Sequence, residues 1–305
     1  MRVLVTGASG FVGKATVAKL IERGATLRCL LRRESDRSSL EKLDCEIVEG
    51  DLQDSASLTS ALQDCSTVLH LAAETNPAKP SLVKDVNLKA SEELARLSKE
   101  AGVERFVYLS ALNQARQGAT ASRPWAVVTG SKQKAEALIS AHLPAIILRS
   151  APCYGPGDNF TLPLLKSIRR IQPLLLIPGQ GTFQMQPIWI DDLADCLALA
   201  TLEGKTENEC RDLAGPQVLS GLEFLGKLAS ASSYFKINIH VPETLLKFGG
   251  LPLLRALGRR EWLSLAEKLI AHTATERNFA PALLGRDLIS IENGLNQHNK
   301  KEAKA

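Results

Sequence analysis

The decisive stretch is VTGASGFVG, residues 5–13, which joins a short apolar run to an amphipathic segment. The run before it is typical of a strand, and the apolar spacing after it predicts a helix over 11–24. Its glycines follow the pattern GxxGxxG: Gly7 permits a tight turn, Gly10 lets the backbone approach a pyrophosphate, and Gly13 allows the helix to pack closely on the strand. The first turn of such a helix offers free N–H groups and about half a positive charge to phosphates. The stretch therefore predicts a dinucleotide site with contacts from Gly7, Ser9, Gly10, Phe11, Val12 and Gly13.

Short apolar runs and amphipathic segments alternate from this stretch to residue 151. Their spacing of about 20–35 residues is typical of consecutive right-handed βαβ units. We therefore expect an α/β fold, a doubly wound parallel sheet of the Rossmann type with helices on both faces. The predicted strands are 2–7, 26–32, 46–50, 67–72, 105–111 and 145–151, and the predicted helices are 11–24, 36–43, 55–63, 82–102 and 127–141.

The regular alternation of apolar and amphipathic segments ends after residue 151, where YGPGDN (154–159) has turn composition. We expect a dinucleotide-binding domain over 1–155, its sheet completed by segments from 156–215. A smaller α+β lobe over 156–297 would cover the carboxyl ends of the strands, where ligands of open parallel sheets bind. Residues 298–305 read as a polar tail.

Composition narrows the class of protein. The 305 residues are 45% hydrophobic and 23% charged, which excludes disordered and fibrous chains. A net charge of +4 is too small to indicate a nucleic-acid partner. No apolar run approaches the roughly 20 residues of a membrane-spanning helix, and no secretory signal precedes the first predicted strand.

The six cysteines include no CxxC pair, and no group of His, Cys, Asp and Glu has metal-ligand spacing. Reduced thiols fit a cytoplasmic protein better than a secreted disulfide scaffold. We therefore expect a cytoplasmic chain without a metal site.

The residues after the second predicted strand bear on the choice of nucleotide. An NAD site carries an acid there, about 20 residues beyond the glycines, to bind the ribose 2′-hydroxyl. This chain has Arg32 and Arg33 at that point, and its first carboxylate is Glu34. An arginine can bind a 2′-phosphate with two charge-assisted hydrogen bonds. The sequence therefore favours NADP(H); the alternative is NAD, with Glu34 on the ribose and a solvated arginine pair.

Motifs in order along the chain strengthen this prediction: TGASGFVG, GDL (50–52), HLAA (70–73), VNLKA (86–90), RFVYLSA (105–111) and YGPGDNF (154–160). In combination they resemble the extended and atypical short-chain dehydrogenase/reductase superfamily, of the NAD-dependent epimerase/dehydratase type. FQMQPIWIDDLADCLAL (183–199) is further similar to the branch around the nucleotide-binding accessory subunit of respiratory complex I. The resemblance implies adenine contacts from Asp51 and Leu52, a ribose and phosphate lining from Leu71, Ala72 and Ala73, and Pro152 near the nicotinamide.

Catalysis in the superfamily uses a Tyr-x-x-x-Lys pair assisted by a serine, and the lysine charge lowers the tyrosine pKa. The resemblance places the lysine at Lys132 and the serine at Ser110, as catalytic and cofactor-binding residues. The tyrosine position is Val128, which cannot transfer a proton. The three tyrosines of the chain lie elsewhere, at Tyr108, Tyr154 and Tyr234.

Several residues keep two interpretations. Tyr154 is either a substitute acid or a packed turn residue. Lys132 either binds the nicotinamide ribose or is a solvated helix lysine, and Ser110 is either a site residue or a structural strand end. Asn87 either bends its helix, as in relatives of the superfamily, or is an ordinary helix residue. His70 reads as packed against the cofactor site rather than as a base.

Three functions follow from these observations. The first is an NADP(H)-dependent oxidoreductase of an unidentified small organic substrate that lacks the usual tyrosine. The second is a non-catalytic NADP(H)-binding protein of an assembly or a redox sensor, and the third is a sugar-nucleotide epimerase or dehydratase, which Val128 disfavours. By analogy with the superfamily, a homodimer through 82–102 and 127–141 is a further expectation. The apolar segment 245–258 is either core or a partner or membrane surface.

Overall fold

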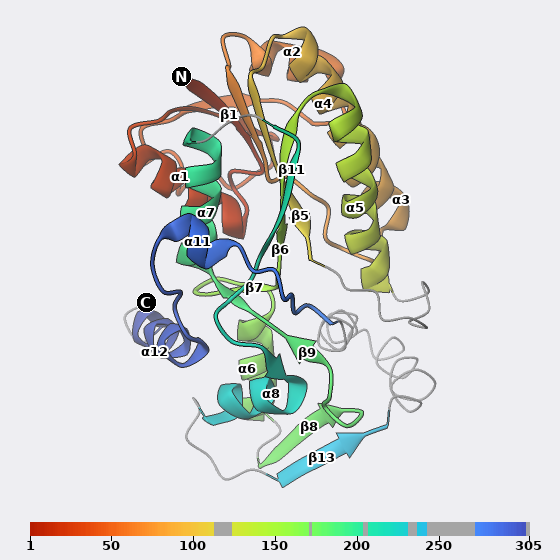
Figure 1. Ribbon diagram of the computed structural model, residues 1–305, viewed down its shortest axis with the longest axis vertical. Coiled ribbons are helices and arrows are strands. Elements are labelled where there is room, and N and C mark those ends of the chain that lie inside the picture. Colours follow the sequence, from red (N-terminus) through yellow and green to blue (C-terminus); the bar gives the residue numbers. More distant parts are fainter. Residues whose placement is uncertain (113–123, 171–172, 204–206, 231–236, 243–271, 303–305) are drawn as a thin grey trace.

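The computed structural model describes residues 1–112, 124–170, 173–203, 207–230, 237–242 and 272–302. Its centre is a parallel sheet of seven strands in the order β11-β6-β5-β4-β1-β2-β3 (Figure 1). The strands are β1 (Arg2–Thr6), β2 (Thr26–Leu31), β3 (Glu46–Glu49), β4 (Thr67–His70), β5 (Arg105–Ala111), β6 (Ala145–Ser150) and β11 (Glu209–Leu213). Strand order reverses beside β1, which is the point where open sheets of this kind bind ligands.

Helices cover both faces of the sheet, as the alternating pattern predicts (Figure 1). One face carries α1 (Phe11–Glu22), α7 (Ile190–Leu202) and α11 (Ala280–Leu284), and the other carries α2 (Ser55–Leu62), α3 (Pro80–Lys84), α4 (Ser91–Glu100) and α5 (Pro124–His142). A π-helical segment, η1 (Asp85–Ala90), joins α3 to α4.

Strand β1 shows why the sequence forms this sandwich. Val3 and Val5 pack into the core beneath α1 and α7, whereas Leu4 packs into the core beneath α2 and α4. Side chains alternate between the faces of a strand, so a strand covered by helices on both sides must be apolar throughout. The run VLV meets that requirement.

The second lobe lies below the carboxyl edge of the sheet (Figure 1). Its core includes Phe160, Trp189 and Phe224. The lobe contains β7 (Cys153–Tyr154), α6 (Thr161–Arg170), β8 (Leu174–Pro178), β9 (Gln184–Met185), β10 (Ile188–Trp189), β12 (Leu219–Ser220), α8 (Gly221–Ser230), β13 (Ile237–Val241) and α12 (Ile291–Glu302).

One predicted helix is wrong. Residues 36–43 form turns between β2 and β3. The carboxylate of Asp36 accepts hydrogen bonds from both the backbone N–H and the hydroxyl of Ser38, at 3.1 and 2.6 Å. Aspartate and serine compete with a helix through such local bonds, and here the turn wins.

Three remaining expectations concern the cysteines, the membrane and the apolar segment near the C-terminus. All six cysteines lie in described segments, and none forms a disulfide. Among the described helices, none is long and apolar enough to cross a membrane. The apolar segment 245–258 lies outside the described residues.

Candidate nucleotide-binding site

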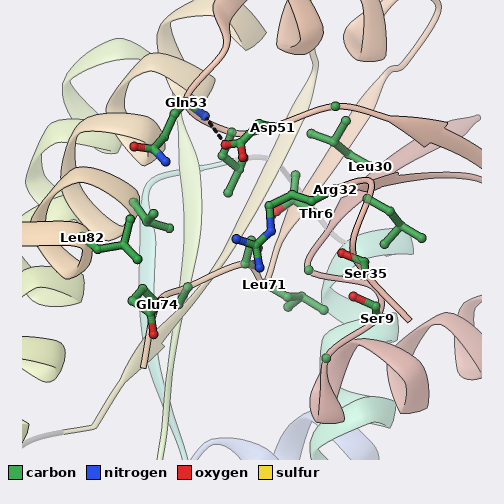
Figure 2. Close-up of a pocket in the computed structure, with 18 residues that line it drawn as sticks. Thr6, Ser9, Leu30, Arg32, Ser35, Asp51, Gln53, Leu71, Glu74 and Leu82 are labelled. Atoms are coloured by element: carbon green, nitrogen blue, oxygen red, sulfur yellow. Dashed lines mark hydrogen bonds between the residues drawn. The ribbon is translucent and has the colours of Figure 1, made fainter. Parts of the chain in front are cut away.

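A cavity of about 260 Å³ opens at the carboxyl ends of β1, β2, β3 and β4. Figure 2 shows Arg32 extending into it, with Ser9 and Ser35 on one side and Gln53 and Glu74 on the other. The cavity is lined by nine of the sixteen residues expected to bind a cofactor: Gly7, Ser9, Gly10, Arg32, Asp51, Leu52, Leu71, Ala72 and Ala73.

The glycine turn forms the floor of the cavity. Gly7 has φ +75°, and a Cβ there would lie 2.5 Å from the backbone nitrogen of Ala72. Gly10 is the N-cap of α1 and provides no side-chain cap, so N–H groups of the first turn are left for a ligand. These features fit a pyrophosphate, which needs backbone donors and close approach.

The other predicted residues of this turn have a different position. Phe11 and Val12 belong to the first turn of α1 and pack against the second lobe. Gly13 faces the turn itself: a Cβ there would lie 2.1 Å from the carbonyl oxygen of Gly7. These three residues shape the turn without lining the cavity.

The two arginines that follow β2 differ in their position relative to the cavity. Arg32 lines the cavity, whereas Arg33 does not. The guanidinium of Arg32 lies 3.3 Å from the carboxylate of Glu34, and both side chains are exposed. Glu34 itself does not line the cavity, so the acid that could serve an NAD ribose is outside it.

Asp51 and Asn87 hold the loops around the cavity. The carboxylate of Asp51 accepts a hydrogen bond of 2.8 Å from the backbone N–H of Gln53 (Figure 2). Asn87, buried in the π-helical segment, accepts from the backbone N–H of Glu74 and donates to its carbonyl oxygen, at 2.8 and 3.0 Å. The side chain of Asn87 thus positions the segment after β4, which lines the cavity.

His70 is a structural residue in this arrangement. Its ring is fully buried, with Nδ1 2.7 Å from the Thr6 hydroxyl and Nε2 2.9 Å from the Ser91 hydroxyl. Burial and the nearby charge of Lys132 lower the pKa of His70 to about 3. A neutral, doubly hydrogen-bonded imidazole agrees with packing rather than with a base.

Lys132 and Ser110, the residues expected at the nicotinamide end, form hydrogen bonds with other groups of the protein. Lys132 is buried, and its ammonium donates a 2.7 Å hydrogen bond to the carbonyl oxygen of Leu109. The hydroxyl of Ser110 donates to the carboxylate of Glu136 at 2.5 Å. Val128 is buried on the same helix as Lys132. Neither Lys132 nor Ser110 lines the described cavity.

Tyr154 and Pro152 lie where the sheet meets the second lobe. The phenol of Tyr154 donates to the carbonyl oxygen of Ser290 at 3.3 Å, and its ring packs edge-on against Trp189. Burial raises the pKa of Tyr154 above its usual value, which opposes an acid–base role. Pro152 accepts a backbone hydrogen bond from Ile188 and does not line the cavity.

Sequence reasoning missed several cavity residues, of which Ser35 is the most informative. Its backbone N–H bonds to the carbonyl oxygen of Arg32, which closes a turn and brings the serine side chain to the cavity. The spacing RxxS after a strand could have indicated this turn. The others were unspecific in sequence: Thr6, Leu30, Leu31, Gly50, Gln53, Glu74, Leu82 and Val86.

The buried lysine gives a prediction for stability. Burial lowers the pKa of Lys132 to about 8, so the unfolded chain binds more protons than the folded one between pH 8 and the ordinary value of 10.5. Stability therefore rises with pH in this window. Between pH 8 and 10, we expect the wild type to gain on the order of 2 kcal/mol relative to Lys132→Met. Urea unfolding at stepped pH measures the difference, and parallel curves for the two proteins would contradict it.

A parallel sheet with a cavity at its carboxyl edge is typical of α/β nucleotide-binding proteins, and comparison with known proteins gives the family of this chain. Residues 3–211 match the model of the NAD dependent epimerase/dehydratase family, so the chain belongs to that family. Among the described residues, no three His, Cys, Asp or Glu side chains gather as a metal site.

Curated relatives include both subunits of assemblies and enzymes. The chain is 26% identical over 223 residues to NADH dehydrogenase [ubiquinone] 1 alpha subcomplex subunit 9 of Arabidopsis thaliana, covering 71% of this chain and 54% of that protein. It is 30% identical over 193 residues to ceramide reductase of Caulobacter vibrioides, covering 63% and 58%. The chain thus spans little more than half of these relatives.

Solved structures share the fold of the described residues. UDP-glucose 4-epimerase of Thermotoga maritima, with UDP-glucose, has a TM-score of 0.76 at 20% identity and covers 100% of this chain and 99% of that one. UDP-glucose 4-epimerase of Thermus thermophilus, in complex with NAD, has a TM-score of 0.73 at 20% identity and covers 100% of both chains.

Proposed function

We propose that this chain binds NADP(H) in the cavity at the carboxyl edge of the sheet. The observation that carries the proposal is the position of Arg32, which lines the cavity while Glu34 does not. A guanidinium can bind a 2′-phosphate, and an acid in the same place would repel it. The hydroxyl of Ser35, brought to the cavity by the adjoining turn, supplies a further donor for the phosphate.

The order of the strands indicates which residues would bind the other parts of the nucleotide. Asp51, two residues after β3, serves the adenine, and the glycine turn serves the pyrophosphate. The segment Leu71–Glu74, held by Asn87, leads toward β5 and the nicotinamide.

Two roles would use the bound nucleotide. As an atypical oxidoreductase, the protein would transfer hydride between NADP(H) and a small organic substrate, with a proton from solvent or from the substrate. As a non-catalytic protein, it would hold NADP(H) as a structural or redox-sensing element of an assembly. The names of its relatives include both kinds: a ceramide reductase and a subunit of NADH dehydrogenase.

The described geometry favours the non-catalytic role. Val128 has no proton to transfer, and the side chains of Lys132 and Ser110 are both directed to internal partners. An epimerase or dehydratase is disfavoured for the same reason, since the superfamily's catalysis uses the absent tyrosine. We further propose a cytoplasmic location and pairing with a second copy or with an assembly partner.

The deciding experiment combines binding with turnover. We expect purified protein to enhance NADPH fluorescence strongly and to consume no NADPH with aldehydes, ketones or quinones. Substrate-dependent oxidation that disappears in Lys132→Ala would establish the oxidoreductase instead. The absence of binding by both NADPH and NADH would overturn the proposal.

Restoring the tyrosine tests whether that residue alone is missing. Val128→Tyr should produce no vigorous turnover, because Lys132 and Ser110 remain bonded to Leu109 and Glu136. NADPH oxidation with the same carbonyl panel measures this. Brisk activity in the variant would show that the site is otherwise intact and that its internal bonds open readily.

A further inference from the structure

A buried carboxylate holds the hydroxyl of Ser110. Glu136 lies one helical turn beyond Lys132 on α5 and accepts the Ser110 hydroxyl at 2.5 Å. Arg149, on β6, binds the same carboxylate with two groups: its Nε lies 3.0 and 3.1 Å from the two oxygens, and its Nη2 lies 2.5 Å from Oε2. The serine and the carboxylate are both almost fully buried.

This cluster determines the polarity of the serine. A hydroxyl has one proton to donate and two lone pairs to accept with, whereas an ionised carboxylate only accepts. Arg149 forms an ion pair with Glu136 and so supplies the opposite charge that a buried carboxylate needs. The single proton of Ser110 is therefore committed to Glu136, and only its lone pairs remain for any other group.

The position of Ser110 indicates which group that would be. Ser110 lies near the end of β5, beside β4, whose continuation at Leu71–Glu74 lines the cavity. The strands beneath the adenine end, β2 and β3, lie on the other side of β1. Three strand steps separate β2 from β5, about 14 Å at the usual spacing. A dinucleotide laid along this edge brings its nicotinamide toward Ser110.

We propose that Glu136, held by Arg149, is a positioning residue that fixes Ser110 as a hydrogen-bond acceptor for the carboxamide NH₂ of the nicotinamide. The inference rests on the proposed binding of NADP(H). Because Ser110 donates its proton to Glu136, its hydroxyl cannot donate to a carbonyl oxygen of the ligand. It can only accept a hydrogen bond from a donor group of the ligand.

The test compares NADP⁺ with its 3-acetylpyridine analogue, in which a methyl ketone replaces the carboxamide. Both carry a carbonyl oxygen, but only the carboxamide carries N–H donors. In Glu136→Gln, the amide oxygen faces Arg149 and the amide NH₂ donates to the hydroxyl oxygen of Ser110. The hydroxyl of Ser110 can then donate its own hydrogen bond to the ligand. The variant then binds either ring, and its preference for NADP⁺ over the analogue should fall about three- to tenfold relative to wild type, as measured by titration calorimetry.

Two further variants keep the test interpretable. Ser110→Ala should lose the same preference, because it removes the acceptor and leaves the sequence of α5, which carries Glu136, unchanged. Glu93→Gln is the matched control: Glu93 accepts the hydroxyl of Ser55 at 2.8 Å, is held by Arg96 and does not line the cavity. It should keep the wild-type ratio.

The outcomes separate this inference from the proposed function. If the wild type binds neither nucleotide, the proposed function fails. If it binds NADP⁺ and folded Glu136→Gln or Ser110→Ala keeps the wild-type ratio, the function stands and the role of Glu136 is overturned.

Discussion

Gly13→Ala should weaken NADPH binding more than about 100-fold and lower the free energy of unfolding. The added Cβ would lie 2.1 Å from the carbonyl oxygen of Gly7 and 2.7 Å from that of Ala8. Both contacts are backbone atoms of the turn, so no side chain can move to relieve them. Helix α1 must shift away, which costs about 1–3 kcal/mol in a packed core and displaces the N–H groups that face the phosphates.

Fluorescence titration with NADPH and urea unfolding measure the two effects together. Gly226→Ala is the control, because it sits inside α8 and a Cβ added there would meet nothing within 4 Å beyond the backbone of its own helix. Alanine there should stabilise the protein by up to about 1 kcal/mol and leave binding unchanged. Full NADPH affinity in Gly13→Ala would show that the turn does not hold the nucleotide.

Arg32→Ala should raise the dissociation constant for NADPH about 10- to 100-fold and that for NADH less than about twofold. The range corresponds to one or two charge-assisted hydrogen bonds to the 2′-phosphate, which NADH lacks. Because the side chain of Arg32 is exposed, the fold should not change. Parallel fluorescence titrations with the two nucleotides measure the ratio.

Arg33→Ala separates charge from position in this experiment. It removes the same charge one residue further on, from a side chain that does not line the cavity. We expect a loss of less than about threefold, from long-range attraction alone. An equal loss of NADPH and NADH in Arg32→Ala would contradict the 2′-phosphate contact.

The sheet could be predicted from sequence because its signals are local. Strands such as β1 are buried on both faces and must be apolar, and Gly7 and Gly13 are required by close backbone contacts at the turn. The predicted helix over 36–43 is wrong although the deciding signal there is also local. The backbone N–H and the hydroxyl of Ser38 donate to the carboxylate of Asp36, and these bonds favour a turn over a helix.

The site could be predicted only in part, because its partners are far apart in sequence. Nothing near Ser110 indicates Glu136, 26 positions on, and nothing near Asn87 indicates the backbone of Glu74. These bonds exist only once β4, β5 and α5 are packed. Sequence identified the residues that carry chemistry, and the fold determined which groups they contact.

The edge strand β11 and the helix α7 also bear on how this chain folds during synthesis. Both lie beyond residue 188, yet they complete the core around α1 and β6. When residues 1–155 have left the ribosome, the sheet still lacks its outer strand and α1 still exposes the surface that α7 will cover. The first half therefore cannot complete its core until about 60 more residues have been synthesised. High contact order of this kind slows folding.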